Sequence, residues 1–227
     1  MNAIVQCLKR SRFVYWAYNL RNGFWKHGLQ VEMKGKDVLI NGIRVRQSGK
    51  DNLLCIEAGA RICQCTFQIS GDHNRIYIGA GASLRGTHFH MEDDGNEIHI
   101  GAGTTTTDQV HISAIEGTKV CIGEDCMISA EIYMSTGDGH TVCDRCGNRT
   151  NPSRDIVLGD HVWIGTKTVI GKNFRIGSHS ILAAGSVCVA SGEAEDNVVM
   201  GGNPAKVVKR DVDWLRERIP TEERHEG

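Results

Sequence analysis

The stretch Leu158–Cys188, LGDHVWIGTKTVIGKNFRIGSHSILAAGSVC, decides the fold. Every sixth position in it is aliphatic or cysteine, and glycine follows the first four of these residues: Leu158, Ile164, Ile170, Ile176, Leu182 and Cys188. A helix would space apolar residues three, four and seven apart, and a simple strand would alternate them, so this period fits neither. Each hexad instead predicts a short extended run, an inward aliphatic side chain and a corner at which glycine turns the chain with little strain.

A second, longer period precedes this stretch. Four isoleucines lie 22 residues apart, each preceded by a cluster rich in Gly, Asp or Asn: Ile56, Ile78, Ile100 and Ile122. Because three hexads make 18 residues, each of these coils carries four additional residues at a corner, where such clusters favour turns. Stacked hexapeptide coils form a parallel β-helix, and we expect about six or seven of them. The β-helix is predicted over 48–190, after a capping segment 1–47 and before a closing segment 191–227.

The two ends of the chain differ from the coils. The first 26 residues interleave aromatic and basic side chains, which predicts a helix that caps the open end of the solenoid. An alternative is that this segment is an interfacial anchor, associated peripherally with a membrane. At the other end we expect a closing strand and bend over 197–208 and a short last helix over Asp211–Arg218.

Composition bounds the partners and the compartment. A net charge of −1 provides no global field for nucleic acid, so we expect no nucleic-acid partner and only local anion sites. Nine cysteines are an odd number with no secretory signal before them, and we expect them to be reduced. There is also no apolar run of about 18 residues, so we expect no spanning helix and a cytoplasmic protein.

The hexad pattern fails between Ser135 and Asp155, STGDGHTVCDRCGNRTNPSRD. This polar stretch is rich in turn residues and predicts a loop extruded from the solenoid, where functional residues tend to lie. Cys143 and Cys146 supply only two of the four ligands of a structural zinc site, so we expect loop cysteines without a special role and no metal.

Three motifs carry a family resemblance: Asp160–Gly165 (DHVWIG), the hexads up to Val187, and Gly201–Lys206 (GGNPAK). Together they resemble the hexapeptide-repeat acyltransferases, and are most similar to the polysaccharide and sugar O-acetyltransferases. The specific match covers 134–209. The resemblance implies a left-handed parallel β-helix, acetyl-CoA as acyl donor, a carbohydrate acceptor, and a homotrimer whose active sites lie between subunits.

In this family a histidine in the loop before the Trp-Ile-Gly hexad is the catalytic base, and the matching residue is His140. Imidazole, with a pKa near 6.5, can take a proton from a sugar hydroxyl at neutral pH and return it to a leaving thiolate. On the acceptor side, Asp138 or Asp144 could orient the ring. Trp163 is either an outward aromatic of a coil or, by the resemblance, a residue that lines the cleft against sugar or pantetheine.

The resemblance also places the coenzyme. Its pantetheine arm would follow backbone groups at Gly165, Thr166 and Ala184, and its phosphates would meet Lys206 and Lys209. One departure is that the family often has Thr-Lys after the last hexads, where this chain has Val189 and Ala190.

Three alternatives remain open from the sequence. The acceptor could be an amino sugar, which would make the protein an N-acetyltransferase. A γ-carbonic-anhydrase-like metal enzyme would have to use His88, His90, His111 and His140, although the expected pair of histidines five positions apart is missing. The third is a solenoid without catalytic activity that only assembles with partners.

Overall fold

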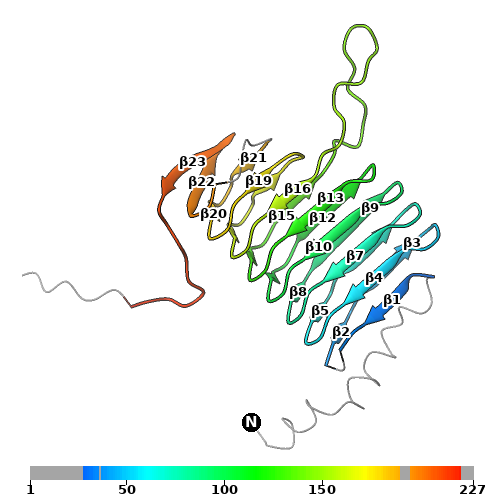
Figure 1. Cartoon of the computed structure of the whole chain (residues 1–227), viewed down its shortest axis with the longest axis horizontal. Helices are drawn as coiled ribbons and strands as arrows, with labels where there is room; N and C mark the ends of the chain where they lie inside the picture. The colour runs from blue at the N-terminus through cyan, green and yellow to red at the C-terminus, as the bar shows by residue number, and fades with distance from the viewer. Residues whose placement is uncertain (1–27, 36, 190–194, 221–227) are drawn as a thin grey trace, which may run out of the picture.

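The computed structural model describes residues 28–35, 37–189 and 195–220. In this part of the chain all regular structure is β, and successive coils stack into one elongated solenoid (Figure 1). Seven complete coils each give one strand to each of three sheets, and every pairing between coils is parallel. The predicted all-β parallel β-helix is confirmed.

Each sheet follows one side of the solenoid. Sheet A contains β1 (Gln30–Met33), β4 (Leu53–Ile56), β7 (Arg75–Ile78), β10 (Glu97–Ile100), β13 (Lys119–Ile122), β16 (Ile156–Leu158) and β19 (Arg175–Ile176). Sheet B contains β2 (Leu39–Asn41), β5 (Arg61–Cys63), β8 (Ser83–Arg85), β11 (Thr105–Thr106), β14 (Met127–Ile128), β17 (Trp163–Ile164), β20 (Ile181–Leu182), β22 (Val198–Gly202) and β23 (Ala205–Arg210). Sheet C contains β3 (Arg44–Gln47), β6 (Thr66–Ile69), β9 (Thr87–Glu92), β12 (Val110–Ile115), β15 (Ile132–Ser135), β18 (Val169–Ile170) and β21 (Val187–Cys188).

The hexad aliphatics form the core. Leu158 stacks on Ile176 in sheet A, Ile164 on Leu182 in sheet B, and Ile170 on Cys188 in sheet C. All six residues are at most 2% exposed. Stacked 18-residue coils therefore form three inward columns of apolar side chains, one for each sheet. Burial of these columns is the main term that stabilises the fold.

The 22-residue coils place their extra residues at the corner between sheets C and A. A ladder of buried asparagines, Asn52, Asn74 and Asn96, runs along this corner. The Oδ1 atom of Asn74 accepts hydrogen bonds from the backbone N and Nδ2 of Asn96, both at 2.9 Å. The Asn74 backbone N in turn donates to Asn52 Oδ1 at 2.9 Å. The loop that interrupts the hexads leaves the solenoid at this same corner, between β15 and β16 (Figure 1).

Both predicted ends need correction. The solenoid begins at β1, before the predicted boundary at residue 48, because the strands of 30–47 pair with the second coil. The closing strand forms as the antiparallel hairpin of β22 and β23. The helix expected over Asp211–Arg218 is wrong, since this segment is irregular in the structure. The aromatic and basic N-terminal segment, with its predicted capping or membrane role, lies outside the described residues.

No helix in the described ranges is both long enough and apolar enough to cross a bilayer.

We predict that Asn74→Ala lowers the free energy of unfolding by about 2 to 3 kcal/mol, because buried partners on two coils lose their hydrogen bonds. Urea denaturation measures this. Asn41→Ala, at an exposed position of β2, is the matched control and should change stability by less than about 0.5 kcal/mol. Equal effects of the two substitutions would contradict a structural role for the ladder.

Candidate functional site

The loop 136–155 projects further from the solenoid than any other described segment (Figure 1). Its tip is a tight turn organised by Asp144, which accepts hydrogen bonds from the backbone N of Cys146 at 2.8 Å and of Asn148 at 2.9 Å. The Asn148 side chain also donates to Asp144 and, with these backbone groups, lowers the pKa of its carboxyl group. Asp144 therefore shapes the turn, and both loop cysteines are exposed free thiols.

Asn151 holds the backbone around His140. Its Nδ2 donates to the carbonyl oxygen of His140 at 2.8 Å and to Asp138 Oδ2 at 2.7 Å, and its Oδ1 accepts from the backbone N of Val142 at 2.8 Å. Lys172 Nζ also contacts Asp138 Oδ2, at 2.5 Å. The hydrogen bond from Lys172, followed by that from Asn151, lowers the pKa of Asp138.

Glu116 ties the far side of the loop to the preceding coil. Its carboxylate accepts from Ser153 Oγ at 2.8 Å and pairs with Arg149 Nη2 at 2.7 Å. Beside it, Thr136 Oγ1 accepts from the backbone N of Ile115 at 3.0 Å. These contacts fix both ends of the loop on the rigid corner.

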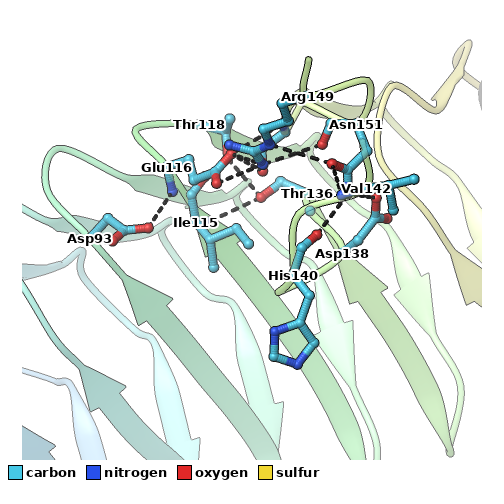
Figure 2. Close-up of polar contacts among 12 residues, drawn as sticks. Asp93, Ile115, Glu116, Thr118, Thr136, Asp138, His140, Val142, Arg149 and Asn151 are labelled. Atoms are coloured by element: carbon cyan, nitrogen blue, oxygen red, sulfur yellow. Dashed lines mark hydrogen bonds and ion pairs between the residues drawn. The ribbon is translucent and has the colours of Figure 1, made fainter. Parts of the chain in front are cut away.

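The imidazole of His140 projects away from this network (Figure 2). It is exposed and makes no side-chain hydrogen bond with any of the described residues. The structure therefore does not bring Asp138 or Asp144 to the ring, since both carboxylates hold the loop itself. The predicted base is presented by its backbone, with both ring nitrogens free for a ligand.

Trp163 lies on a different face from His140. It belongs to β17 in sheet B, and its Nε1 donates to Ser129 Oγ at 3.4 Å. The loop that carries His140 leaves the opposite corner, between sheets C and A. Within one chain the two residues do not form a common site.

The residues predicted to hold coenzyme A lie at one end of sheet B. Gly165 and Ala184 follow the neighbouring strands β17 and β20, and a Cβ on Gly165 would lie 2.5 Å from the backbone N of Ala184. The carbonyl oxygen of Thr166 accepts from the backbone N of Gly185 at 2.8 Å. Lys206 and Lys209 are exposed on β23 and make no ion pair with a described residue.

Trp214, for which no role was predicted from the sequence, anchors the C-terminal segment on sheet B. Its ring stacks on His161 with centroids 4.1 Å apart, and its Nε1 donates to the His161 carbonyl at 2.7 Å. In return His161 Nε2 donates to the Trp214 carbonyl at 2.9 Å, and Nδ1 donates to Asp125 Oδ2 at 2.7 Å. Arg216 contacts the other oxygen of Asp125 at 2.9 Å. The Trp214 ring lies 6.1 Å from Trp163, so this clamp also borders the predicted cleft residue.

The cluster of side chains that could hold a metal ion does not contain the histidines of the carbonic-anhydrase alternative. Among the described residues, one cluster of three side chains has potential metal-ligand atoms that all lie within 4.8 Å of one another: His161, His179 and Asp213. Both ring nitrogens of His161 are already engaged. The histidines of that alternative lie elsewhere, on sheet C and on the loop, and do not form such a set.

The clamp predicts a pH-dependent stability. Burial alone would lower the pKa of His161, but the Trp214 carbonyl and the Asp125 carboxylate outweigh it and raise the pKa above its ordinary value of 6.5. Asp213, His179 and Arg216 are the other charged or titratable groups that face the clamp. A raised folded-state pKa contributes stability that is complete below about pH 6.5 and is lost as the pH rises through the folded value.

We therefore expect the melting temperature of the wild type to exceed that of His161→Gln most at about pH 6, and by progressively less as the pH rises above 6.5. Thermal unfolding monitored at intervals from about pH 5.5 to 8.5 measures this. His73→Gln, at an exposed corner, is the control. A difference between wild type and His161→Gln that stays constant over this range would contradict the prediction.

Comparison with known proteins finds a family model and curated relatives that match part of the chain. The model described as bacterial transferase hexapeptide (six repeats) matches residues 155–190. The galactoside O-acetyltransferase of Escherichia coli is 37% identical over 54 residues, which are 24% of this chain and 26% of that protein. The chloramphenicol acetyltransferase of Agrobacterium fabrum is 29% identical over 70 residues, 31% of this chain and 32% of that protein. The matches thus span about a third or less of these relatives.

Solved structures match over far more of the chain. The structure of the polySia-specific acetyltransferase NeuO has a TM-score of 0.72 and 26% identity, covering 84% of this chain and 83% of that chain. The polysialic acid O-acetyltransferase OatWY has a TM-score of 0.71 at 22% identity, covering 86% and 95%, and shows the shared fold. The hexads of residues 155–190 therefore match the hexapeptide model, and over most of its length the chain has the same solenoid fold as these two structures.

Proposed function

We propose that the protein is an acetyl-CoA-dependent O-acetyltransferase that acetylates a sugar hydroxyl of a surface polysaccharide, with His140 as general base. The observation that carries this proposal is the imidazole of His140, held through its backbone by Asn151 with its ring open to a ligand. The likeness to NeuO over most of both chains supports the reaction class.

The mechanism follows from an imidazole placed beside a thioester. A ring nitrogen of His140 takes the proton of the acceptor hydroxyl, and the oxygen attacks the acetyl carbonyl carbon. The tetrahedral intermediate then collapses with cleavage of the C–S bond, and the imidazolium returns its proton to the coenzyme A thiolate. No acyl-enzyme forms, and atoms and charge balance without another reactant.

The coenzyme would follow the end of sheet B. Gly165 is buried against Ala184 of the next coil, at a place where a Cβ does not fit, and Ala184 itself is exposed, so a pantetheine arm would follow the backbone beside Ala184. Lys206 and Lys209 present two cations on β23, which suits the phosphates of coenzyme A. Arg210 is the less available cation, because it pairs with Glu195 at 3.0 Å.

A complete site would require more than one copy of the chain. His140 and Trp163 lie on different faces of one solenoid. The end of sheet B that would bind the coenzyme is likewise on a different face from the loop that carries His140. A homotrimer, in which the loop of one subunit reaches sheet B of the next, would bring these residues together. The eight described cysteines, all free thiols, fit a reducing compartment, and we propose a cytoplasmic location.

We predict that His140→Ala reduces acetyl transfer by about a hundredfold or more, because general-base catalysis typically contributes that much. Thiol release from acetyl-CoA is measured against surface polysaccharides, free sugars and amino sugars. His73→Ala, which removes an exposed histidine from a corner, is the matched control. The assignment fails if His140→Ala keeps wild-type turnover. Transfer to amino sugars alone would make the protein an N-acetyltransferase, and no acetyl-CoA turnover with any acceptor would overturn the proposed function.

We predict a smaller defect for Asn151→Ala, because it releases the backbone of His140 without removing the imidazole. The expected result is a fall in kcat of about tenfold, as positioning is lost, with an unchanged KM for acetyl-CoA. Faster amide exchange in 138–151, with unchanged exchange in the solenoid strands, is the structural readout. An unchanged kcat despite faster exchange would show that the loop need not be held for catalysis.

A further inference from the structure

The outer face of sheet C carries two columns of polar side chains that the proposed mechanism does not use. In the first column, His88 on β9, His111 on β12 and Tyr133 on β15 occupy successive rungs. In the second, Arg46, Gln68, His90, Ser113 and Ser135 occupy successive rungs. These residues form what we call the sheet C trough, which runs along the solenoid axis.

The loop encloses the upper end of the trough. A concave site of about 360 Å³ is lined by the histidines and Tyr133 on its floor and by 137–139 of the loop on its wall. His140 is the next residue of the chain. The trough therefore ends at the loop segment that carries the residue proposed to activate the acceptor.

The floor of the trough suits a carbohydrate. The rings of His111 and Tyr133 stack with centroids 4.9 Å apart and an interplanar angle of 3°. His88 Nδ1 lies 3.3 Å from His111 Nδ1, and the buried Nε2 of His88 has no hydrogen-bond partner among the described residues. Burial lowers the pKa of His111 to about 4 and also lowers that of His88. Both rings are thus neutral at pH 7, and such rings can both donate to and accept from sugar hydroxyl groups.

The lower end of the trough is cationic. Arg44 and Arg46 are exposed on β3 and make no ion pair with a described residue. Four rung spacings separate β3 from β15, which is roughly 19 Å. The acidic groups beside the upper end are Glu92 and Asp138, and Lys172 already neutralises Asp138. An anionic group would therefore be drawn to the β3 end.

We propose that the sheet C trough binds an extended acidic glycan along the solenoid axis, with the reacting hydroxyl beside His140 and a carboxylate of a distant sugar residue at Arg44 and Arg46. This inference rests on the proposed function and specifies its acceptor. The charge of the two arginines and the stacked rings of His111 and Tyr133 indicate the chemistry of this ligand. The distance between the two ends requires an oligomer, because a single sugar cannot reach both.

The test is calorimetric binding, without acetyl-CoA, of sialic acid oligomers of increasing length and of neutral maltohexaose as comparison. We expect affinity for the acidic oligomers to rise with length and to exceed that for maltohexaose. The double variant Arg44→Ala/Arg46→Ala and the single variant Tyr133→Ala should each weaken binding of the longest oligomer about tenfold or more. Tyr133 is 49% exposed, so its removal leaves the core intact.

Arg75→Ala, on sheet A, is the matched control and should bind like the wild type. Unchanged affinity in both trough variants, no binding of any acidic oligomer, or equal affinity for maltohexaose would each overturn the proposal. A change of oligomeric state in the trough variants, seen by light scattering, would instead show that this face is an interface between copies. Thiol release with a glycan acceptor that the trough variants do not alter would overturn the trough but leave the proposed function standing.

Discussion

The close vertical approach of successive coils is the constraint on which the rest of the structure depends. At Gly49 a Cβ would lie 2.1 Å from the carbonyl oxygen of Gly71, and at Gly165 it would meet the backbone of the next coil at 2.5 Å. Corners without side chains allow the strands of adjacent coils to pair along their whole length. Inward positions must then repeat from coil to coil, whereas outward positions carry no packing requirement and are free to hold functional groups.

This constraint explains what the sequence could predict. In the later coils the inward residue and its glycine recur at a fixed spacing, so the hexads could be read directly and the three columns follow. The first coil was missed because Val38, Ile40 and Val45 are buried in the same way but lack the hexad spacing and its glycines. The segment Asp211–Arg218 has local features of a helix, but two hydrogen bonds and a ring stack between Trp214 and His161 hold it irregular. Tertiary contacts outweigh helix propensities of a few tenths of a kcal/mol.

The candidate site could be predicted only in part from the sequence, for a related reason. A histidine in a polar loop between hexads could be identified, but the partners of Asp138 and Asp144 could not, because Asn151 and Lys172 reach Asp138 only once the loop has folded back on the coils. The spacing of three aromatic residues could, however, have predicted the sheet C trough. His88, His111 and Tyr133 lie 23 and 22 residues apart, about one coil length, which places them on successive rungs of one sheet.

The same geometry bears on which acceptor this solenoid suits. Each coil adds one rung to every face at a spacing of about 4.8 Å, so a face of the solenoid is a rigid, periodic surface rather than a pocket. A small sugar would contact one or two rungs, and rungs further away could not contribute to its binding. A polymer lying along the axis gains contacts from each coil without any rearrangement of the protein. Because the binding surface is already ordered, little of the binding free energy is lost to conformational entropy. Under the proposed function, the loop at the upper end of the sheet C trough would then act on whichever hydroxyl the remaining rungs bring into register with His140.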